Sequence, residues 1–178
     1  MTMLTKTQKA WLARLSKTKT ITIVPYNPQV KSVFQKIKKE VKSVLGKKVR
    51  VVHKGATSLG ISGQGELDVY IPVPTKKFNH YLEKMKQSFG EPGSCYPLKR
   101  ARFNRWTDGF KIEVFLINQN SQGWKKGVAF ENYLKNHPKA LSAYEKLKEK
   151  GHRLSVQEYY RRKVKFINNV LAKNSKPD

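Results

Sequence analysis

The stretch Glu66-Leu67-Asp68-Val69-Tyr70-Ile71-Pro72-Val73 decides the fold that this sequence is expected to adopt. Side chains alternate across a β-strand, so Glu66 and Asp68 should point to one face while Leu67 and its apolar neighbours point to the other. Two like charges at this spacing repel each other. A divalent cation removes the conflict, because Mg²⁺ is usually bound by carboxylates together with substrate phosphates and waters. The stretch therefore predicts a strand with one buried face and one metal-binding face.

A later stretch repeats the pattern, because Lys111-Ile112-Glu113-Val114-Phe115-Leu116 places Glu113 on a strand between apolar neighbours. If this strand lies beside that of Glu66 and Asp68, three of the chain's 12 acidic residues converge. In a phosphoryl-type transfer, one metal ion activates the attacking hydroxyl and another stabilises the leaving group. We therefore predict that Glu66, Asp68 and Glu113 are catalytic and hold Mg²⁺, with two ions expected. The alternative is three solvated strand residues that face scattered lysines.

The segment before the first acidic strand is predicted to bind phosphate. A strand that includes Lys54 leads into a tight turn, where Gly55 lets the backbone approach an anion closely and successive N–H groups point at a phosphate. Thr57 and Ser58 add hydroxyl donors. The glycines that follow match neither the Walker A nor the dinucleotide-binding spacing. The predicted phosphate ligands here are Lys54, Gly55, Ala56, Thr57 and Ser58, and the alternative is a simple turn.

Basic side chains near the second acidic strand are predicted to bind phosphate as well. Arg102, Arg105 and Lys111 lie close to Glu113 in sequence, and arginine grips phosphate through two parallel hydrogen bonds. They would hold a triphosphate or an RNA backbone, and the alternative is a solvated basic hairpin. His53 is expected to hydrogen-bond the loop rather than to act as a base. With four dispersed His and one Cys, a zinc site is not expected.

Strands that come first and helices that come later in one short chain predict a single α+β domain with a helical C-terminal part. The apolar periodicity sets the boundaries of the elements. The strands are expected at 21–24, 49–53, 66–73, 100–106 and 110–117, and the helices at 10–15, 30–45, 78–89, 122–136, 138–150 and 155–172. We expect a basic N-terminal arm over 1–20, one domain over 21–173 and a frayed tail over 174–178.

The composition points to a polyanionic partner. The 178 residues carry 37 Lys+Arg against 12 Asp+Glu, a formal net charge of +25, which attracts nucleic acid through steering and counterion release. The alternative is excess lysine that serves solubility alone. No apolar run approaches the ~20 residues that cross a bilayer, so no membrane partner is expected. The N-terminus lacks the features of a secretory signal, and the single Cys95 fits a reducing, cytoplasmic compartment.

These motifs together resemble a known family. A Gly-containing turn after an apolar strand, an acidic-apolar-acidic strand and a later apolar-acidic-apolar strand are similar to the signature of the nucleotidyltransferase superfamily. The chain resembles the GrpB branch of that superfamily over about residues 21 to 173. The stretches that carry the resemblance are Ile23-Val24-Pro25-Tyr26-Asn27-Pro28, His53-Lys54-Gly55-Ala56-Thr57-Ser58, Trp124, Phe130-Glu131-Asn132-Tyr133-Leu134-Lys135-Asn136-His137-Pro138 and Tyr144-Glu145-Lys146-Leu147-Lys148.

The resemblance implies a nucleotidyltransferase-like mixed β-sheet with flanking helices, a phosphate loop at Gly55 to Ser58, and metal ligands at Glu66, Asp68 and Glu113. One departure is Gly55-Ala56, where the superfamily usually has Gly-Gly or Gly-Ser. The expected function is Mg²⁺-dependent transfer of NMP from an NTP to a hydroxyl. RNA is the favoured acceptor because of the charge, and the tRNA 3′ end is one candidate. The alternatives are transfer to a protein or small molecule, and a catalytically silent RNA- or ribosome-binding module.

Overall fold

A computed structural model describes residues 3–174, and their contacts group them into two compact units. The sheet unit consists of Tyr26–Ile61 and Gly65–Lys125. The helical unit consists of the described residues up to Pro25, Ser62–Gln64 and the described residues from Lys126 onward. The predicted α+β class, with a mixed sheet, flanking helices and a helical C-terminal part, is confirmed.

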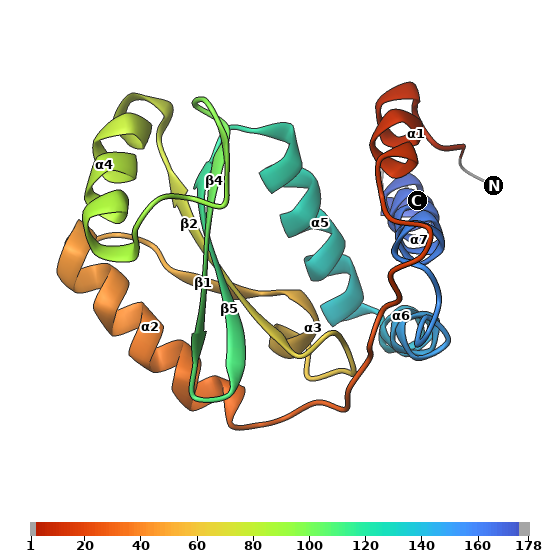
Figure 1. Ribbon diagram of the computed structural model, residues 1–178. Helices are drawn as coiled ribbons and strands as arrows, with labels where there is room; N and C mark the ends of the chain where they lie inside the picture. The colour runs from red at the N-terminus through yellow and green to blue at the C-terminus, as the bar shows by residue number, and fades with distance from the viewer. Residues whose placement is uncertain (1–2, 175–178) are drawn as a thin grey trace. The chain divides into compact units, whose positions relative to one another are not determined.

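The sheet unit contains one five-stranded sheet with the order β1-β2-β5-β4-β3 (Figure 1). Its centre is the parallel pair of β2 and β5, and the outer strands run antiparallel to their neighbours. The strands are β1 (Val52–Lys54), β2 (Glu66–Val73), β3 (Ser94–Tyr96), β4 (Arg100–Thr107) and β5 (Phe110–Asn118).

One face of the sheet is buried under two helices, α2 (Val30–Leu45) and α4 (Phe78–Phe89), which lie side by side (Figure 1). The apolar residues of α2 recur every three or four positions and form one buried stripe that packs on the sheet. On the strands, Leu67 and Ile112 are register partners and both are fully buried in this core. The main core residues are Val30, Val33, Ile37, Val41, Leu45, Leu67, Val69, Ile71, Phe78, Met85, Phe103, Ile112, Val114 and Leu116.

The opposite face of the sheet carries the polar side chains of β2 and β5, and aromatic rings cover its end. Tyr70 stacks on Phe115 with ring centroids 4.5 Å apart and on Trp124 with centroids 5.8 Å apart. Trp124 belongs to the first turn of α5 (Gln122–Asn136), which begins in the sheet unit and continues into the helical unit. We call this second face of the sheet the carboxylate face.

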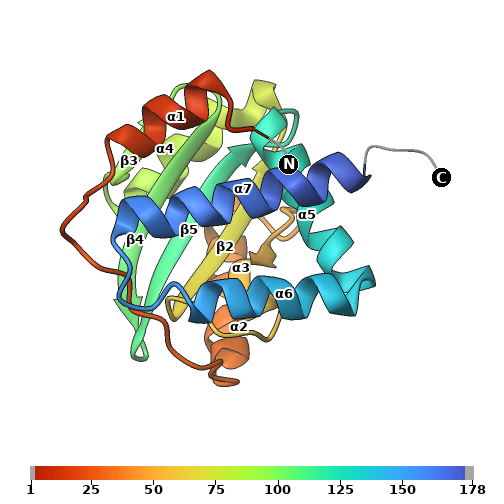
Figure 2. The same ribbon diagram turned by 90° about the vertical axis from the view of Figure 1, so that its right-hand side faces the viewer.

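In the helical unit, α7 (Val156–Asn174) lies between α1 (Lys6–Ala13) and α6 (Pro138–Glu149) (Figure 2). Gln8 and Asn168 exchange two side-chain hydrogen bonds of 3.0 Å, and Trp11 packs edge-on against Tyr160. The predicted helix at 10–15 thus exists but begins earlier, because Thr5 and Gln8 form a capping box. The described part of the basic arm is therefore packed on α7.

Two of the expected strands are corrected, and one observed strand was not expected. Residues 21–24 form no strand, because Ile21 bonds the backbone of Arg153 and Leu154 while Val24 makes an isolated bridge to Gly63. The strand expected at 49–53 begins only at Val52, since the backbone before it is still turning. The turn-rich segment 91–97 contains β3, which the sequence did not predict.

Other expected boundaries differ by one or two residues. The loop after β1 opens with a short helix, α3 (Gly55–Ser58), and a 3₁₀ turn, η1 (Thr75–Lys77), precedes α4. Helix α7 includes Asn174, and the rest of the predicted tail, 175–178, lies outside the described residues. Within the described chain, no helix is long and apolar enough to cross a membrane.

Truncation of a buried leucine to alanine should lower the free energy of unfolding far more than the same truncation at the surface. Leu67→Ala removes a side chain with 0% exposure from the centre of the sheet, so we expect a loss of about 2–5 kcal/mol in the free energy of unfolding. Leu98→Ala is the control, because Leu98 is 43% exposed and its truncation should cost no more than about 0.5 kcal/mol. Urea unfolding of the two variants measures the difference, and equal losses would contradict this description of the core.

Candidate functional site

Three carboxylates come together on the carboxylate face, where the central strands run side by side. The parallel register of β2 and β5 makes Asp68 the direct neighbour of Glu113. Glu66, Asp68 and Glu113 each offer one carboxylate oxygen, and these three atoms lie within 4.8 Å of one another. The predicted convergence is therefore confirmed. That the cluster binds metal stays a prediction.

Basic side chains of the same face neutralise part of this cluster. Lys111 precedes Glu113 by two residues and is the register partner of Glu66, so its side chain projects between the two carboxylates. Its Nζ donates to Glu66 Oε1 at 2.5 Å and lies 3.2 Å from Glu113 Oε1. Arg102 Nη1 lies 3.5 Å from the same Glu113 oxygen. Glu113 is only 8% exposed, and these two cations offset the cost of burying its charge.

The contacts of Lys111 stabilise its charged form. Burial lowers the pKa of Lys111, but the hydrogen bond and the charges of Glu66 and Glu113 outweigh it and raise that pKa above its ordinary value. The ammonium is therefore fully charged at neutral pH. It lies against two of the three carboxylates at which a metal cation would be bound.

The donor set of the cluster fits a hard divalent cation. Mg²⁺ binds oxygen at about 2.0–2.1 Å in octahedral geometry, so its ligand oxygens lie about 3–4 Å apart. Small changes in the side-chain torsion angles, which move the carboxylate oxygens by about 1–2 Å, would bring these atoms, now within 4.8 Å, to that spacing. Such a cation would compete with the Lys111 ammonium for Glu66 and Glu113. The residues present thus fit the ion, provided that Lys111 moves.

The loop that follows β1 is pressed against this cluster. A Cβ atom added to Gly55 would lie 2.2 Å from Asp68 Oδ2, and the φ of Gly55 is +79°. Both the space and the backbone conformation therefore require glycine here. Lys54, the register partner of Asp68, is 8% exposed and has its Nζ 5.5 Å from the centroid of the Trp124 ring. The predicted phosphate loop and the carboxylate cluster are thus in direct contact.

The two hydroxyl groups of the loop hold its own structure together. Thr57 Oγ1 donates to the Glu66 carbonyl at 3.1 Å and lies 2.9 Å from His53 Nε2. Ser58 Oγ donates to the Gly55 carbonyl at 2.9 Å. Each hydroxyl has one proton to donate, so both are already used inside the protein. A phosphate role for Thr57 and Ser58, which stays a prediction, would require these internal hydrogen bonds to break. The predicted ligand Ala56 is the second residue of α3.

His53 lies on the face opposite the carboxylates. Its ring stacks on Phe34 of α2 with centroids 5.0 Å apart, while its Nε2 meets the Thr57 hydroxyl. The expectation that His53 hydrogen-bonds the loop is therefore confirmed.

The two predicted arginine ligands lie on opposite faces of the sheet. Arg102 lies on the carboxylate face, opposite Phe115 in the register. Arg105 lies on the helix-covered face, where it makes two hydrogen bonds to Glu40 of α2 and its Cζ lies 5.0 Å from the ring centroid of Phe89. The grouping of Arg105 with the phosphate ligands is therefore corrected. The signal was available in the sequence, because residues three apart on a strand point to opposite faces.

The same alternation reveals two residues of this face that the sequence reasoning missed. Asn104 and Trp106 follow Arg102 at two-residue steps and are both exposed. Asn104 is the register partner of Glu113, and Trp106 is that of Lys111. The signal for both was present in the sequence, because the two-residue period of a strand continues from Arg102 through Asn104 to Trp106.

The close contact between Gly55 and Asp68 should make alanine costly at this position. Gly55→Ala is expected to destabilise the protein by more than about 1 kcal/mol, because the new methyl group displaces the Asp68 carboxylate. Gly60→Ala is the matched control, since Gly60 has a similar φ of +70° but no atom within 4 Å of the added Cβ. Thermal unfolding of both variants measures the difference. Equal destabilisation would mean that backbone strain alone explains the glycine.

The position of Lys111 predicts competition with metal. Lys111→Met should lower stability without metal by about 1–3 kcal/mol, between the values for exposed and buried ion pairs. Added Mg²⁺ or Mn²⁺ should then raise the melting temperature of the variant more than that of the unchanged protein. Lys86→Met is the control, because Lys86 pairs with Glu83 and Glu91 at the surface of α4. Metal-induced shifts of the same size in all three proteins would contradict a cation site at Lys111.

Comparison with known proteins agrees with this fold. The model of the GrpB protein family matches residues 20–173. The structure is similar to that of the conserved protein GrpB from Enterococcus faecalis, with a TM-score of 0.66 and 20% sequence identity over 86% of this chain and 99% of that one, a likeness that shows the fold. A comparison with curated proteins gave no match. The resemblance noted in the sequence is thereby confirmed: this chain belongs to the GrpB family and has its nucleotidyltransferase-like fold.

Proposed function

We propose that this protein is a Mg²⁺-dependent nucleotidyltransferase that transfers NMP from an NTP to a hydroxyl acceptor. The observation that carries the proposal is the convergence of Glu66, Asp68 and Glu113 within 4.8 Å, on two parallel strands beside a glycine loop. Like charges this close together repel one another and need positive charge to offset them, which favours a cation-binding role for the cluster.

Each part of the site has a role in this proposal. Glu66, Asp68 and Glu113 would hold Mg²⁺, and two ions are expected, together with oxygens of the triphosphate. When bound, Mg²⁺ supplies activation of the acceptor hydroxyl and neutralises charge on the phosphates. Lys54 and the backbone of Gly55–Ser58 would hold the triphosphate, because Lys54 borders Asp68 in the register and Gly55 touches its carboxylate.

Lys111 and Arg102 would bind phosphate oxygens on the other side of the carboxylates. Both side chains lie on the carboxylate face and already approach Glu113, at 3.2 Å and 3.5 Å. Once released from the carboxylates, these two positive groups would remain on the carboxylate face and offset the charge of a phosphate there. Arg105 has no part in this, because it is paired with Glu40 on the far face.

RNA is the acceptor that the charge favours, and the tRNA 3′ end is one candidate. The chain has 37 basic residues against 12 acidic ones, so it attracts a polyanion over most of its surface. We place this activity in the cytoplasm, where NTP and RNA meet. Transfer to a hydroxyl of a protein or small molecule is a variant of the same chemistry that uses the same carboxylates.

A second candidate function is a catalytically silent RNA- or ribosome-binding module. It is favoured by Lys111, whose ammonium lies against two of the three carboxylates, and by Thr57 and Ser58, whose hydroxyls are used inside the loop. Such a module would bind RNA in a salt-sensitive manner. Its binding would be indifferent to Mg²⁺ and to substitution of Asp68.

Incubation of labelled NTPs with total RNA and Mg²⁺ tests the enzymatic proposal. We expect labelled RNA, and Asp68→Asn should lower the rate by at least about a hundredfold, since a metal ligand is worth a few kcal/mol of charge stabilisation. Glu83→Gln is the matched control, because this exposed carboxylate on α4 pairs only at the surface and its loss should leave the rate unchanged. Absence of labelled product, or labelling that Asp68→Asn does not diminish, would refute the proposal.

A further inference from the structure

Trp106 is much the most exposed of the three tryptophans. It is 73% exposed, whereas Trp11 is 41% and Trp124 is 7% exposed. Single exposed apolar residues are common on protein surfaces, so exposure alone decides nothing. What distinguishes Trp106 is its position on the sheet and the polar groups that surround it.

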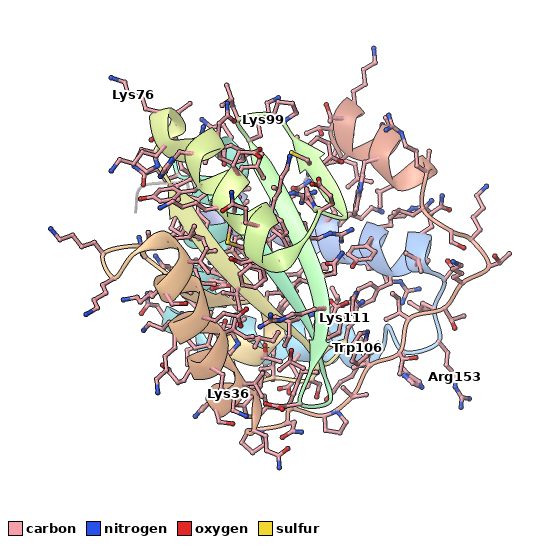
Figure 3. All side chains as sticks on the ribbon, turned by 60° about the vertical axis from the view of Figure 1, so that its left-hand side comes forward. Lys36, Lys76, Lys99, Trp106, Lys111 and Arg153 are labelled. Atoms are coloured by element: carbon pink, nitrogen blue, oxygen red, sulfur yellow. The ribbon has the colours of Figure 1, made fainter. Side chains whose placement is uncertain are left out.

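The ring of Trp106 lies beside the carboxylate cluster. Trp106 and Lys111 are register partners in the antiparallel pair of β4 and β5, so their Cβ atoms are about 4.5–5.5 Å apart on the same face. Figure 3 shows the two side chains together near one end of the β4–β5 hairpin, away from Lys99. Lys111 in turn contacts Glu66 and Glu113. Lys111 therefore connects Trp106 with the candidate metal ligands Glu66 and Glu113.

Trp106 is the last residue of a row of polar and aromatic side chains along β4. Arg102, Asn104 and Trp106 follow at two-residue steps on the carboxylate face and offer a guanidinium, an amide and an aromatic ring. Arg100 precedes Arg102 on the same face, where its Cζ lies 5.1 Å from the ring centroid of Tyr96 and 5.7 Å from that of Phe115. Strand β3 pairs only with Arg100–Arg102, which leaves the rest of β4 at the edge of the sheet.

This combination fits single-stranded nucleic acid. Proteins bind single strands with positive side chains that contact the backbone and aromatic rings on which bases stack. The indole offers a flat face for one base, and the arginines offer bidentate phosphate contacts. A protein partner would instead need a larger apolar patch, whereas the neighbours of Trp106 on this face, Asn104 and Lys111, are polar.

The position of Trp106 also indicates whether a base stacked on its ring belongs to the acceptor or to the NTP. In the strand order β1-β2-β5-β4, the phosphate loop follows β1 on one side of the carboxylates, and Trp106 lies in β4 on the other side. Transfer of a phosphoryl-type group is roughly in line, so the attacking hydroxyl and the leaving pyrophosphate lie on opposite sides of the reacting phosphorus. If the triphosphate occupies the loop side, the acceptor approaches from the side of β4.

We propose that Trp106 stacks on the base at the end of the acceptor RNA, with Arg102 and Asn104 binding the strand beside it. The assignment of this RNA as the acceptor rests on the proposed nucleotidyl transfer. The binding of single-stranded RNA to Arg102, Asn104 and Trp106 does not. The base of the NTP and a protein partner are the competing occupants that the test must separate.

The test measures binding without turnover. A labelled single-stranded RNA oligonucleotide is titrated against the protein in EDTA, and its fluorescence anisotropy gives the dissociation constant. Trp106→Ala should weaken binding about tenfold, since base stacking on an aromatic ring contributes that much or more. Trp106→Phe should restore affinity to within about threefold, because it keeps an aromatic face. Trp11→Ala, on α1 in the helical unit, is the matched control and should have no effect.

The intrinsic fluorescence of the same proteins identifies the occupant. RNA should quench the emission of the unchanged protein, and Trp106→Phe should abolish most of that quenching. ATP alone should quench little. Strong quenching by ATP that Trp106→Phe abolishes would assign the ring to the NTP base and overturn the acceptor assignment. If Trp106→Ala leaves both the RNA affinity and the melting temperature unchanged, the RNA-binding proposal is overturned. A ring that serves a protein partner would give this same result.

Failure of the two proposals can be told apart. If Trp106→Ala weakens RNA binding but no NMP transfer is detected, the RNA surface stands and the enzymatic proposal fails. If transfer is detected and the KM for RNA is the same in Trp106→Ala, the enzymatic proposal stands and the role of Trp106 fails. If both stand, Trp106→Ala raises the KM for RNA while the KM for the NTP stays constant.

Discussion

The parallel pairing of β2 with β5 is the constraint on which the site depends. Burial of Leu67, Ile112 and their neighbours against α2 and α4 fixes which face of each strand is apolar, and the register then makes Asp68 adjacent to Glu113. A shift of one residue would drive carboxylates into the core, so the hydrophobic face specifies the register strongly. The carboxylate cluster is thus held in place by the packing on the opposite face of the same strands.

Like charges held this close need compensation, and the chain provides it from its own cations. Lys111 contacts Glu66 and Glu113, and Arg102 approaches Glu113. The pairing of these groups lets Glu113 remain 8% exposed without an isolated buried charge. It also gives the site two states in our proposal, one with an internal ammonium at the carboxylates and one with Mg²⁺ there. The affinity for metal would then be lowered by the cost of displacing Lys111.

The two sides of the cluster differ in chemistry because different strands supply them. On the side of β1, Gly55 allows the loop to touch Asp68, and the backbone and Lys54 provide positive groups close to the carboxylates. On the side of β4, the row that ends at Trp106 is open to solvent and combines basic, amide and aromatic groups. A compact polyphosphate suits the first side and a flexible strand suits the second, and this asymmetry connects the proposed reaction with the proposed RNA surface.

The sequence by itself determined the local elements and which residues of a strand share a face, because apolar periodicity and alternation are local properties. The helix at 30–45, the strand at 66–73 and the common face of Glu66 and Asp68 followed from it. It predicted that Glu113 would join them only on condition that the two strands were neighbours. Tertiary structure decided that condition, the pairing of Arg105 with Glu40, the internal use of the loop hydroxyls, and the position of Trp106 beside Lys111. These depend on which distant segments meet, and strand order and register are set by the packing of the whole sheet rather than by any one stretch of residues.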